Sequence, residues 1–251
     1  MIKEVYQDAL SVLAKKPVRL WGISLLAEVL ALVFSFLFGL VPGVSIAISL
    51  LLGTGLLMVL RHGLHGEEVY AVQLFDCFRD WATIKRLLCG MGWMMLWVFL
   101  WALIPIVGWI FAIIRAYAWR LTPYILMYEP DVAPTQAIKV SEARTKGYKG
   151  KMFWADVLPI IGFIVVSLVL SLLGSIPIVG ILFRLILVLV VIAFYLFITL
   201  FIGLVQVDFY EKIMAKVNEV AQLEASKTAC PNCGELVSGG SFCPNCGTKL
   251  E

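Results

Sequence analysis

The sequence predicts an all-α integral membrane protein with six transmembrane helices in three hairpins, interfacial helices on one side and a small zinc ribbon at the C-terminal end. Two observations predict the membrane class. The chain of 251 residues is 61% hydrophobic and 15% charged, whereas soluble domains are about 45–50% apolar and about 25% charged. Apolar runs of about 18 or more residues, enough to cross a bilayer, also recur along the chain. We predict six spans, at residues 18–40, 43–61, 87–104, 106–128, 153–174 and 178–203.

A repeated proline–glycine motif separates the two spans of each hairpin. The segment IPIVG occurs at residues 104–108 and again at 176–180, and the looser LVPGV occupies 40–44. Proline cannot continue a helix because it lacks the backbone N–H, and glycine permits the backbone of a tight reversal. Each motif therefore predicts a short turn. The repeat leaves two origins open, an internal duplication or one recurring solution to the same turn.

The basic residues indicate the orientation of the spans. They cluster before the first span, in the two long linkers and after the last span, while the three turn motifs contain none. Because cytoplasmic loops are enriched in Lys and Arg, we expect both termini and both long linkers in the cytoplasm. No cleavable signal peptide is expected at the start of the chain. The expected domains are an amphipathic N-terminal helix (1–17), the six-helix transmembrane domain (18–203), a cytoplasmic helix and linker (204–229) and the zinc ribbon (230–251).

Three segments on the expected cytoplasmic side have the pattern of interfacial helices. Residues 2–13 place apolar side chains on one helical face and charged side chains on the opposite face, as in helices that lie in a membrane surface. Residues 70–86 and 134–147 fit the same interpretation. Their basic residues would attract anionic lipid, although an ordinary solvated, positively charged face is the simpler interpretation.

Four cysteines near the C-terminus predict a metal centre. Cys230 and Cys233 form one C-x-x-C pair, and Cys243 and Cys246 form a second, each inside a CPNCG segment. Four thiolates at this spacing suit one structural Zn²⁺ with closed tetrahedral coordination. A pair of disulfides or an iron–sulfur centre is the alternative, and a reducing cytoplasm disfavours disulfides. We expect this small ribbon to dock a protein partner; it has no basic stripe, so nucleic-acid binding is not expected.

Ionisable residues inside the spans form a second candidate site. Glu28 in the first span and Arg115 in the fourth both fall near the expected bilayer midplane, and Arg184 lies nearer the outer end of the last span. Such groups are functional hypotheses by default. Two interpretations stay open: a structural ion pair between Glu28 and Arg115, or a polar site for an ion, a proton or a lipid headgroup. Further charged residues mark the expected cytoplasmic interface: Arg120, Asp156, Lys139, Arg144, Lys146, Lys149 and Lys151.

The sequence contains no evident catalytic set. Its two histidines, His62 and His65, occur in the segment HGLHGEE, whose spacing differs from that of a helical zinc protease. The pattern also lacks a serine–histidine–acid set, a phosphate-binding loop and an intramembrane aspartate pair. We therefore expect a protein that is not an enzyme.

Residues 117–163 resemble part of a known family. The segment YAWRLTPYILMYEPDVAPTQAIKVSEARTKGYKGKMFWADVLPIIGF is similar to the bacterial multi-pass membrane family catalogued as domain of unknown function 975. The likeness covers residues 1 to about 215 and departs from the family at residues 144–146. It implies a bacterial inner-membrane protein without an established activity, and it transfers no catalytic residue. The matching positions are Tyr124, the turn at 129–131, Ala137, Ile138, Ser141, Gly147, Lys149 and Phe153.

These features leave three function hypotheses. The first, which the elaborate inner face and short outer turns favour, is a non-enzymatic scaffold or accessory protein. It would use the zinc ribbon and the basic interfacial helices to bind a partner or organise lipid. The second is a small transporter or channel, in one form a homo-oligomer, with Glu28, Arg115 and Arg184 lining a polar path. The third, an intramembrane enzyme, needs a polar pocket of convergent titratable groups.

Overall fold

The computed structural model divides the chain into two compact units. Met1–Tyr210 forms unit 1 and Glu211–Glu251 forms unit 2. The structure describes residues 1–15, 18–39, 41–176, 180–225, 228–230, 232–233, 236–237, 242 and 244–249.

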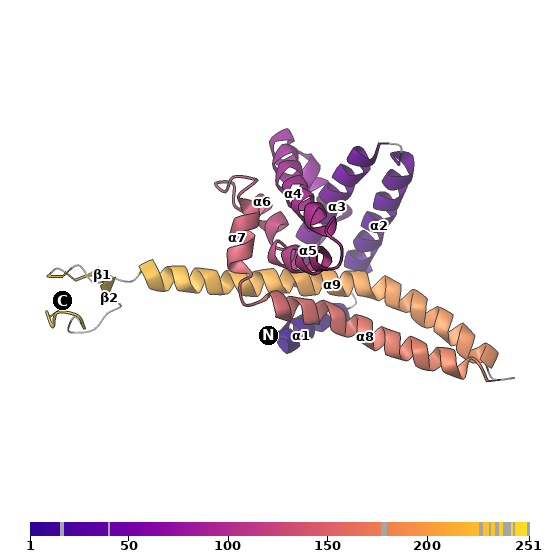
Figure 1. Cartoon of the computed structure of the whole chain (residues 1–251). Coiled ribbons are helices and arrows are strands. Elements are labelled where there is room, and N and C mark those ends of the chain that lie inside the picture. Colours follow the sequence, from indigo (N-terminus) through magenta and orange to yellow (C-terminus); the bar gives the residue numbers. More distant parts are fainter. Residues whose placement is uncertain are drawn as a thin grey trace. The chain divides into compact units, whose positions relative to one another are not determined.

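Helices make up most of the described part of unit 1 (Figure 1). In chain order the elements are α1 (Ile2–Ala14), α2 (Val18–Leu37), α3 (Pro42–Leu64), the 3₁₀ helix η1 (Ala71–Phe78), α4 (Trp81–Ala102), α5 (Val107–Ala118), α6 (Thr122–Tyr128), α7 (Ala137–Arg144), α8 (Lys149–Leu173) and α9 (Gly180–Ala225). The last helix continues into unit 2. There β1 (Thr228–Ala229) pairs antiparallel with β2 (Leu236–Val237), with Thr228 opposite Val237.

Among the described residues, five helices are long and apolar enough to cross a membrane, which identifies the chain as a membrane protein. The candidate spans are Val18–Leu37, Gly43–Leu64, Trp81–Ala102, Lys149–Leu173 and Gly180–Leu223. The last of these lies in α9, which has 46 residues. At 1.5 Å per residue α9 is about 69 Å long, roughly twice the thickness of a bilayer core. Residues 204–225 therefore continue the last helix beyond the length a span requires.

The predicted fourth span, residues 106–128, is not one helix. α5 ends at Ala118 after 12 residues, a length of about 18 Å, and α6 begins at Thr122. Two α7 hydroxyls stabilise the break between them. Ser141 Oγ donates to the Ala118 carbonyl over 2.9 Å and accepts from the Leu121 N–H over 3.2 Å, and Thr145 Oγ1 donates to the same carbonyl over 2.9 Å. Backbone groups freed from a helix in a membrane protein need such buried partners, so α7 permits an interruption that apolar composition alone does not reveal.

The glycine that ends each IPIVG motif lets the returning helix approach the preceding one. A Cβ atom at Gly108 would lie 2.1 Å from the Trp101 carbonyl oxygen, and one at Gly180 would lie 2.4 Å from the Gly174 carbonyl oxygen. Both distances are far below van der Waals contact, so a larger residue would push the helices apart. The motifs join α4 to α5, which contact each other, and α8 to α9, which lie side by side in Figure 1 and stack Phe163 on Phe194. Residue 40 of the first turn and residues 177–179 of the third lie outside the described residues.

The three segments predicted as interfacial helices contribute to the core of unit 1. α1 contacts α3 and α8 and buries Val5, Ala9 and Val12. The predicted helix at 70–86 is instead η1 followed by the start of α4, which Asp80 caps by accepting from the Thr83 N–H over 2.9 Å. α7 buries Ala137, Ile138 and Ser141. Each segment therefore buries part of its apolar face against protein, while Val72 of η1 stays 70% exposed and Trp81 at the start of α4 stays 65% exposed.

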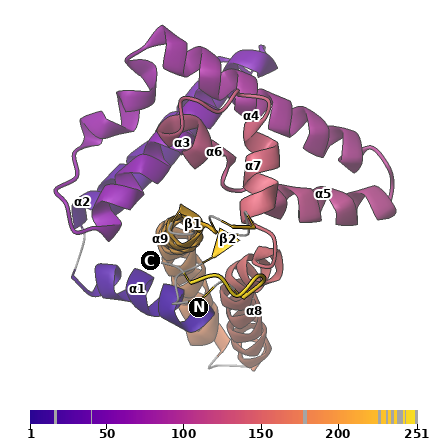
Figure 2. The same cartoon turned by 90° about the vertical axis from the view of Figure 1, so that its left-hand side faces the viewer.

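The buried core of unit 1 lies at one end of the hairpins. We call this the linker end; it comprises α1, η1, α6, α7 and the adjoining parts of α3, α4, α8 and α9. Tyr124 of α6 stacks on Tyr210 of α9 with ring centroids 4.2 Å apart, and Tyr6 of α1 donates to the Ala155 carbonyl of α8 over 2.6 Å. Figure 2 looks nearly along α9, with α1 and α8 on one side of it and α3 to α7 on the other. Fully buried side chains at this end include Leu60, Leu74, Leu87, Leu126, Met152 and Leu204.

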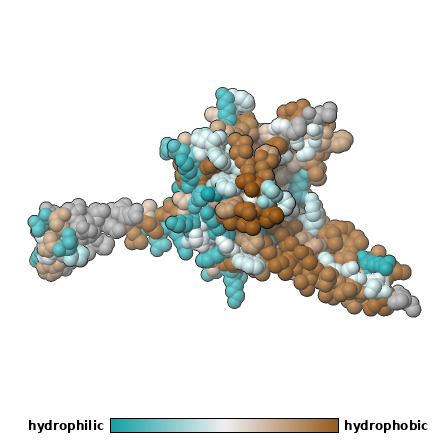
Figure 3. All heavy atoms as spheres, viewed as in Figure 1, coloured by the Kyte–Doolittle hydropathy of each residue, from teal (hydrophilic) through white to brown (hydrophobic). Residues whose placement is uncertain are grey.

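The opposite end of the hairpins, the turn end, is apolar but exposed. It comprises the described helix ends next to the turns that follow α2, α4 and α8. Phe36 is 89% exposed, Ile106 is 74% exposed and Ile181 is 70% exposed. Hydrophobic residues also cover most of the α8–α9 hairpin on the face shown in Figure 3. Because apolar surface of this kind is stable against acyl chains but not against water, the turn end is the part of unit 1 suited to lipid.

Candidate functional site

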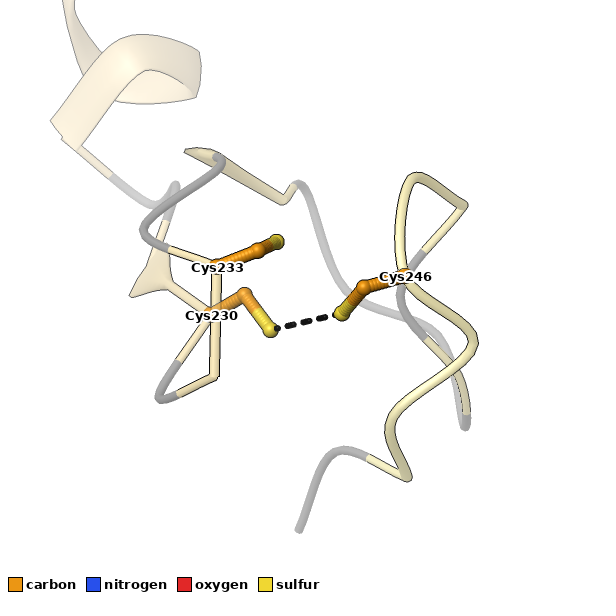
Figure 4. A group of neighbouring side chains, drawn as sticks. All are labelled: Cys230, Cys233 and Cys246. Atoms are coloured by element: carbon orange, nitrogen blue, oxygen red, sulfur yellow. Dashed lines mark hydrogen bonds between the residues drawn. The ribbon is translucent and has the colours of Figure 1, made fainter.

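Three cysteines of unit 2 bring their sulfur atoms together (Figure 4). The Sγ atoms of Cys230, Cys233 and Cys246 lie within 4.8 Å of one another, and those of Cys230 and Cys246 are 3.6 Å apart. Cys230 directly follows β1, and the other two occupy turns. None of the three is in a disulfide. Cys243, the fourth predicted ligand, lies outside the described residues.

Polar neighbours favour the thiolate form of Cys246. Hydrogen bonds to the side chain and backbone of Thr248, with smaller contributions from Cys233 and Cys230, lower the pKa of Cys246 to about 6. The Thr248 Oγ1 atom is 3.1 Å from its sulfur. Asn245 Nδ2 donates to the Cys233 sulfur over 3.8 Å. The turns that position the cysteines thus also supply hydrogen bonds to sulfur, and thiolate is the form that binds metal ions.

The geometry of the cysteine cluster fits a tetrahedral metal ion. With metal–sulfur bonds of about 2.3 Å, the sulfurs of a tetrahedral zinc site lie about 3.8 Å apart. The 3.6 Å separation between Cys230 and Cys246 is close to this value. Thiolates are soft ligands that select zinc, copper(I) or iron–sulfur clusters over magnesium or calcium. The described cysteines are therefore able to hold a metal ion.

Arg115 pairs with a residue that the sequence did not connect to it. Its guanidinium Nη1 donates to Glu142 of α7, and Lys149 Nζ of α8 lies 3.7 Å from the same carboxylate oxygen. The structure therefore does not form the expected clamp between Arg115 and Glu28. The reason is the early end of α5 at Ala118, which places Arg115 beside α7 at the linker end instead of within a continuous span.

Arg120 and Asp156 form a second ion pair at the linker end. The two Arg120 guanidinium nitrogens contact both carboxylate oxygens of Asp156, the Nη2–Oδ1 distance being 3.2 Å. Tyr117 OH also donates to Asp156 Oδ2 over 2.9 Å. The Arg120 side chain is 14% exposed and the Asp156 side chain is 15% exposed. This pair joins the α5–α6 break to α8. Because a buried charge without a partner is strongly destabilising, removing either residue should lower the stability of unit 1.

Two further arginines stabilise the end of α6. Arg144 contacts both carboxylate oxygens of Glu129, with Nη2 and Oε2 2.8 Å apart. Arg86 of α4 donates to the carbonyls of Leu126 over 2.8 Å, of Pro130 over 3.1 Å and of Glu129. The last carbonyls of a helix have no partner within the helix, so Arg86 satisfies the C-terminal end of α6.

Arg184 and Glu28 occupy different environments. Arg184 Nε donates to the Gly174 carbonyl at the end of α8 over 3.2 Å, so it bridges the two helices of its hairpin. Glu28 of α2 is half-buried and forms no ion pair within the part of the chain that the structure describes. The structure therefore does not bring Glu28, Arg115 and Arg184 into one ion-paired cluster.

The remaining predicted interface residues are less constrained. Lys139, Lys146 and Lys151 form no ion pair with any described residue, and Lys151 Nζ lies 5.5 Å from the ring centre of Tyr148. In the histidine segment, His62 Nε2 is 3.8 Å from Glu67 Oε2. Among the described residues, the groups close enough to share a metal ion are the three cysteines alone.

The partners of these charges were not predicted from the sequence. Glu129, Glu142 and Arg86 lie in linkers or at a helix start, where an unpaired solvated charge is the ordinary expectation. One sequence signal pointed to ion pairs: in the linker around α7, acidic residues lie close in sequence to the basic residues and can pair with them. The hydroxyls of Ser141 and Thr145 gave no comparable signal, because their role depends on where α5 stops.

No family model, curated protein or solved structure matches this chain.

Proposed function

We propose that this chain is a non-enzymatic scaffold or accessory protein of a bacterial inner membrane, with both termini and both long linkers in the cytoplasm. Its C-terminal cysteine cluster holds one structural Zn²⁺ and docks a protein partner. Cys243 completes the zinc ligands in this proposal. The basic residues gathered before the first span, in the two long linkers and after the last span support the orientation in this proposal.

The observation that carries the proposal is the pairing of arginines at the linker end. Arg115, Arg120 and Arg144 each contact a carboxylate of the same chain. A transport path or an active site needs charged groups that can exchange partners with a passing ion or substrate. Ion pairs that join α5, α7 and α8 are instead suited to holding a rigid base. A rigid base with an additional cysteine-bearing unit fits a protein whose role is to position other molecules.

The proposed zinc ribbon has an exposed aromatic side chain that is suited to contact a protein partner. Phe242 is 62% exposed, and its backbone bridges to Lys249 within the ribbon. Exposed aromatic residues on a small, rigid module are frequent anchors of protein interfaces. We therefore expect the partner to contact Phe242.

One experiment tests both the metal and the docking. Phe242 is replaced by photoreactive benzoylphenylalanine in cells that make the full-length chain, and the same replacement at Val220 is the control. We expect a discrete protein adduct from position 242 that disappears when Cys230 and Cys246 are both changed to Ser. Elemental analysis of the purified chain should give about one zinc per chain, lost in that double variant and kept in Cys89→Ser.

The alternative, a small transporter or channel, rests on Glu28. Its half-buried carboxylate in α2 forms no ion pair in the described part of the chain, which is the condition a transport site needs. If position 242 gives no adduct and proteoliposomes show ion flux that Glu28→Gln abolishes, transport replaces the scaffold proposal.

A further inference from the structure

A groove between α5 and α8 has the chemistry of a lipid site. The cavity has a volume of about 350 Å³, within the range of about 300–1,000 Å³ typical of small-molecule sites. Its walls are almost entirely apolar, with one cationic side chain. The lining residues are Ile110, Ile113, Ile114, Tyr117, Lys149, Gly150 and Phe153.

The floor of this groove is held in place by contacts already described. The rings of Tyr117 and Phe153 pack edge to face with centroids 5.7 Å apart, and the Tyr117 hydroxyl is fixed on Asp156. Asp156 in turn is held by Arg120. Because these side chains are already ordered, a ligand in the groove loses little free energy in organising its site.

The charge beside the groove is positive and only partly neutralised. Arg115 and Lys149 both contact the Glu142 carboxylate, so two cations share one anion. Lys149 also lines the cavity, which puts the surplus positive charge next to the apolar walls. The Lys149 side chain is 30% exposed, leaving its ammonium group accessible to another anion.

We propose that this groove binds an anionic phospholipid, with an acyl chain against the three isoleucines and the phosphate at Lys149. A free anion would gain nothing from the apolar walls, whereas a lipid satisfies both parts of the site. Lys149 is the first residue of a candidate span, the level at which headgroups and acyl chains meet. The site specifies which lipid the proposed scaffold organises, and to that extent the inference rests on the proposed function.

The test is lipid retention by the purified full-length chain, measured by native mass spectrometry. The probes are phosphatidylglycerol and phosphatidylcholine with identical acyl chains. We expect the chain to retain phosphatidylglycerol about fivefold better, the size of one partly exposed ion pair, and Lys149→Gln to remove this preference. Lys139→Gln removes the same charge from α7 outside the groove and should keep it.

A second variant tests the apolar part of the site. A Cβ atom at Gly150 would meet no atom within 4 Å, so Gly150→Phe can fill the groove without displacing the backbone. It should reduce the retention of both phospholipids, while its unfolding midpoint in detergent stays near that of the unaltered chain.

Three results would overturn the inference. One is an unchanged preference in Lys149→Gln, and another is undiminished retention in Gly150→Phe. The third is displacement of phosphatidylglycerol by millimolar inorganic phosphate, which would mark a site for free anions. Phe242 cross-linking and lipid retention, both measured in the chain with Lys149 unaltered, separate this inference from the proposed function. An adduct without a preference for phosphatidylglycerol removes the lipid site alone, whereas a lipid preference without any adduct removes the docking proposal alone.

Discussion

Both ends of the hairpins in unit 1 carry large apolar side chains, but these side chains have opposite environments. At the linker end, Leu60, Tyr124 and Phe209 are at most 2% exposed. At the turn end, Phe36, Ile106 and Ile181 are at least 70% exposed. The contrast teaches that hydrophobicity predicts which residues avoid water but not whether protein or lipid replaces it. What distinguishes the linker end is a set of short helices, α1, η1, α6 and α7, that covers the apolar faces.

Two arginines show the same contrast. Arg120 at the linker end binds the Asp156 carboxylate, and both side chains are mostly buried. Arg184 near the turn end donates to a backbone carbonyl of its own hairpin. The first links separate parts of unit 1, whereas the second stabilises one turn. Removing them should therefore have unequal effects on the stability of the unit.

The largest predicted effect comes from truncating an aromatic side chain at the linker end. Phe209 is 2% exposed, so Phe209→Ala should lower the free energy of unfolding by about 3–5 kcal/mol. Phe36 is 89% exposed at the turn end, and Phe36→Ala should change stability little because its ring contacts lipid in the folded and unfolded states. The free energy of unfolding of both variants is measured in mixed micelles. Equal losses of unfolding free energy in the two variants would contradict the contrast between the linker end and the turn end.

Removing one partner of the Arg120–Asp156 pair should have the next largest effect. Arg120→Ala leaves a buried carboxylate without its cation, and we expect a loss of about 3 kcal/mol. Arg79 is the matched control: its side chain is 80% exposed, and its contact with Asp76 spans 3.7 Å, so Arg79→Ala should have almost no effect. The same unfolding assay applies. A loss in Arg79→Ala as large as that in Arg120→Ala would contradict a special role for the linker-end pair.

A smaller effect tests the break between α5 and α6. Ser141→Ala removes the hydroxyl that contacts both the Ala118 carbonyl and the Leu121 N–H, which should cost about 1–3 kcal/mol because two buried groups lose a partner. Ser167 is the control on α8: its buried oxygen has no hydrogen-bond partner among the described residues. Ser167→Ala should be neutral or slightly stabilising. If both substitutions cost the same, the hydroxyl of Ser141 does not sustain the break.

The sequence predicted the parts of the fold that depend on local composition. Apolar runs located the five helices among the described residues that are able to cross a membrane, and the two IPIVG motifs located turns whose glycines permit close packing. The fourth span is not one helix. Pro123, in the first turn of α6, is a local sign of a kink, but the break also depends on Ser141 and Thr145, which lie more than 20 residues beyond Ala118. Composition cannot register partners at that distance.

In the candidate site, too, contacts set by local spacing were predicted and contacts between distant segments were not. The spacing of Cys230, Cys233 and Cys246 predicted sulfur atoms that meet, because a C-x-x-C turn brings its own cysteines together. The pairing of Arg115 with Glu142 was not predicted, since it follows from the position of α7 rather than from any local motif. Cys77 in η1 is buried, which raises the pKa of its thiol to about 11 and leaves it protonated at neutral pH.

The most direct test of the contrast between the two ends is photolabelling of the unaltered chain in lipid nanodiscs. Phospholipids with a diazirine in the acyl chain label the residues they touch, and mass spectrometry locates the labels. We predict labels at Phe36, Ile106 and Ile181 and none at Leu60, Tyr124 or Phe209. Labels on the second group, or their absence from the first, would contradict a protein-packed linker end and a lipid-facing turn end.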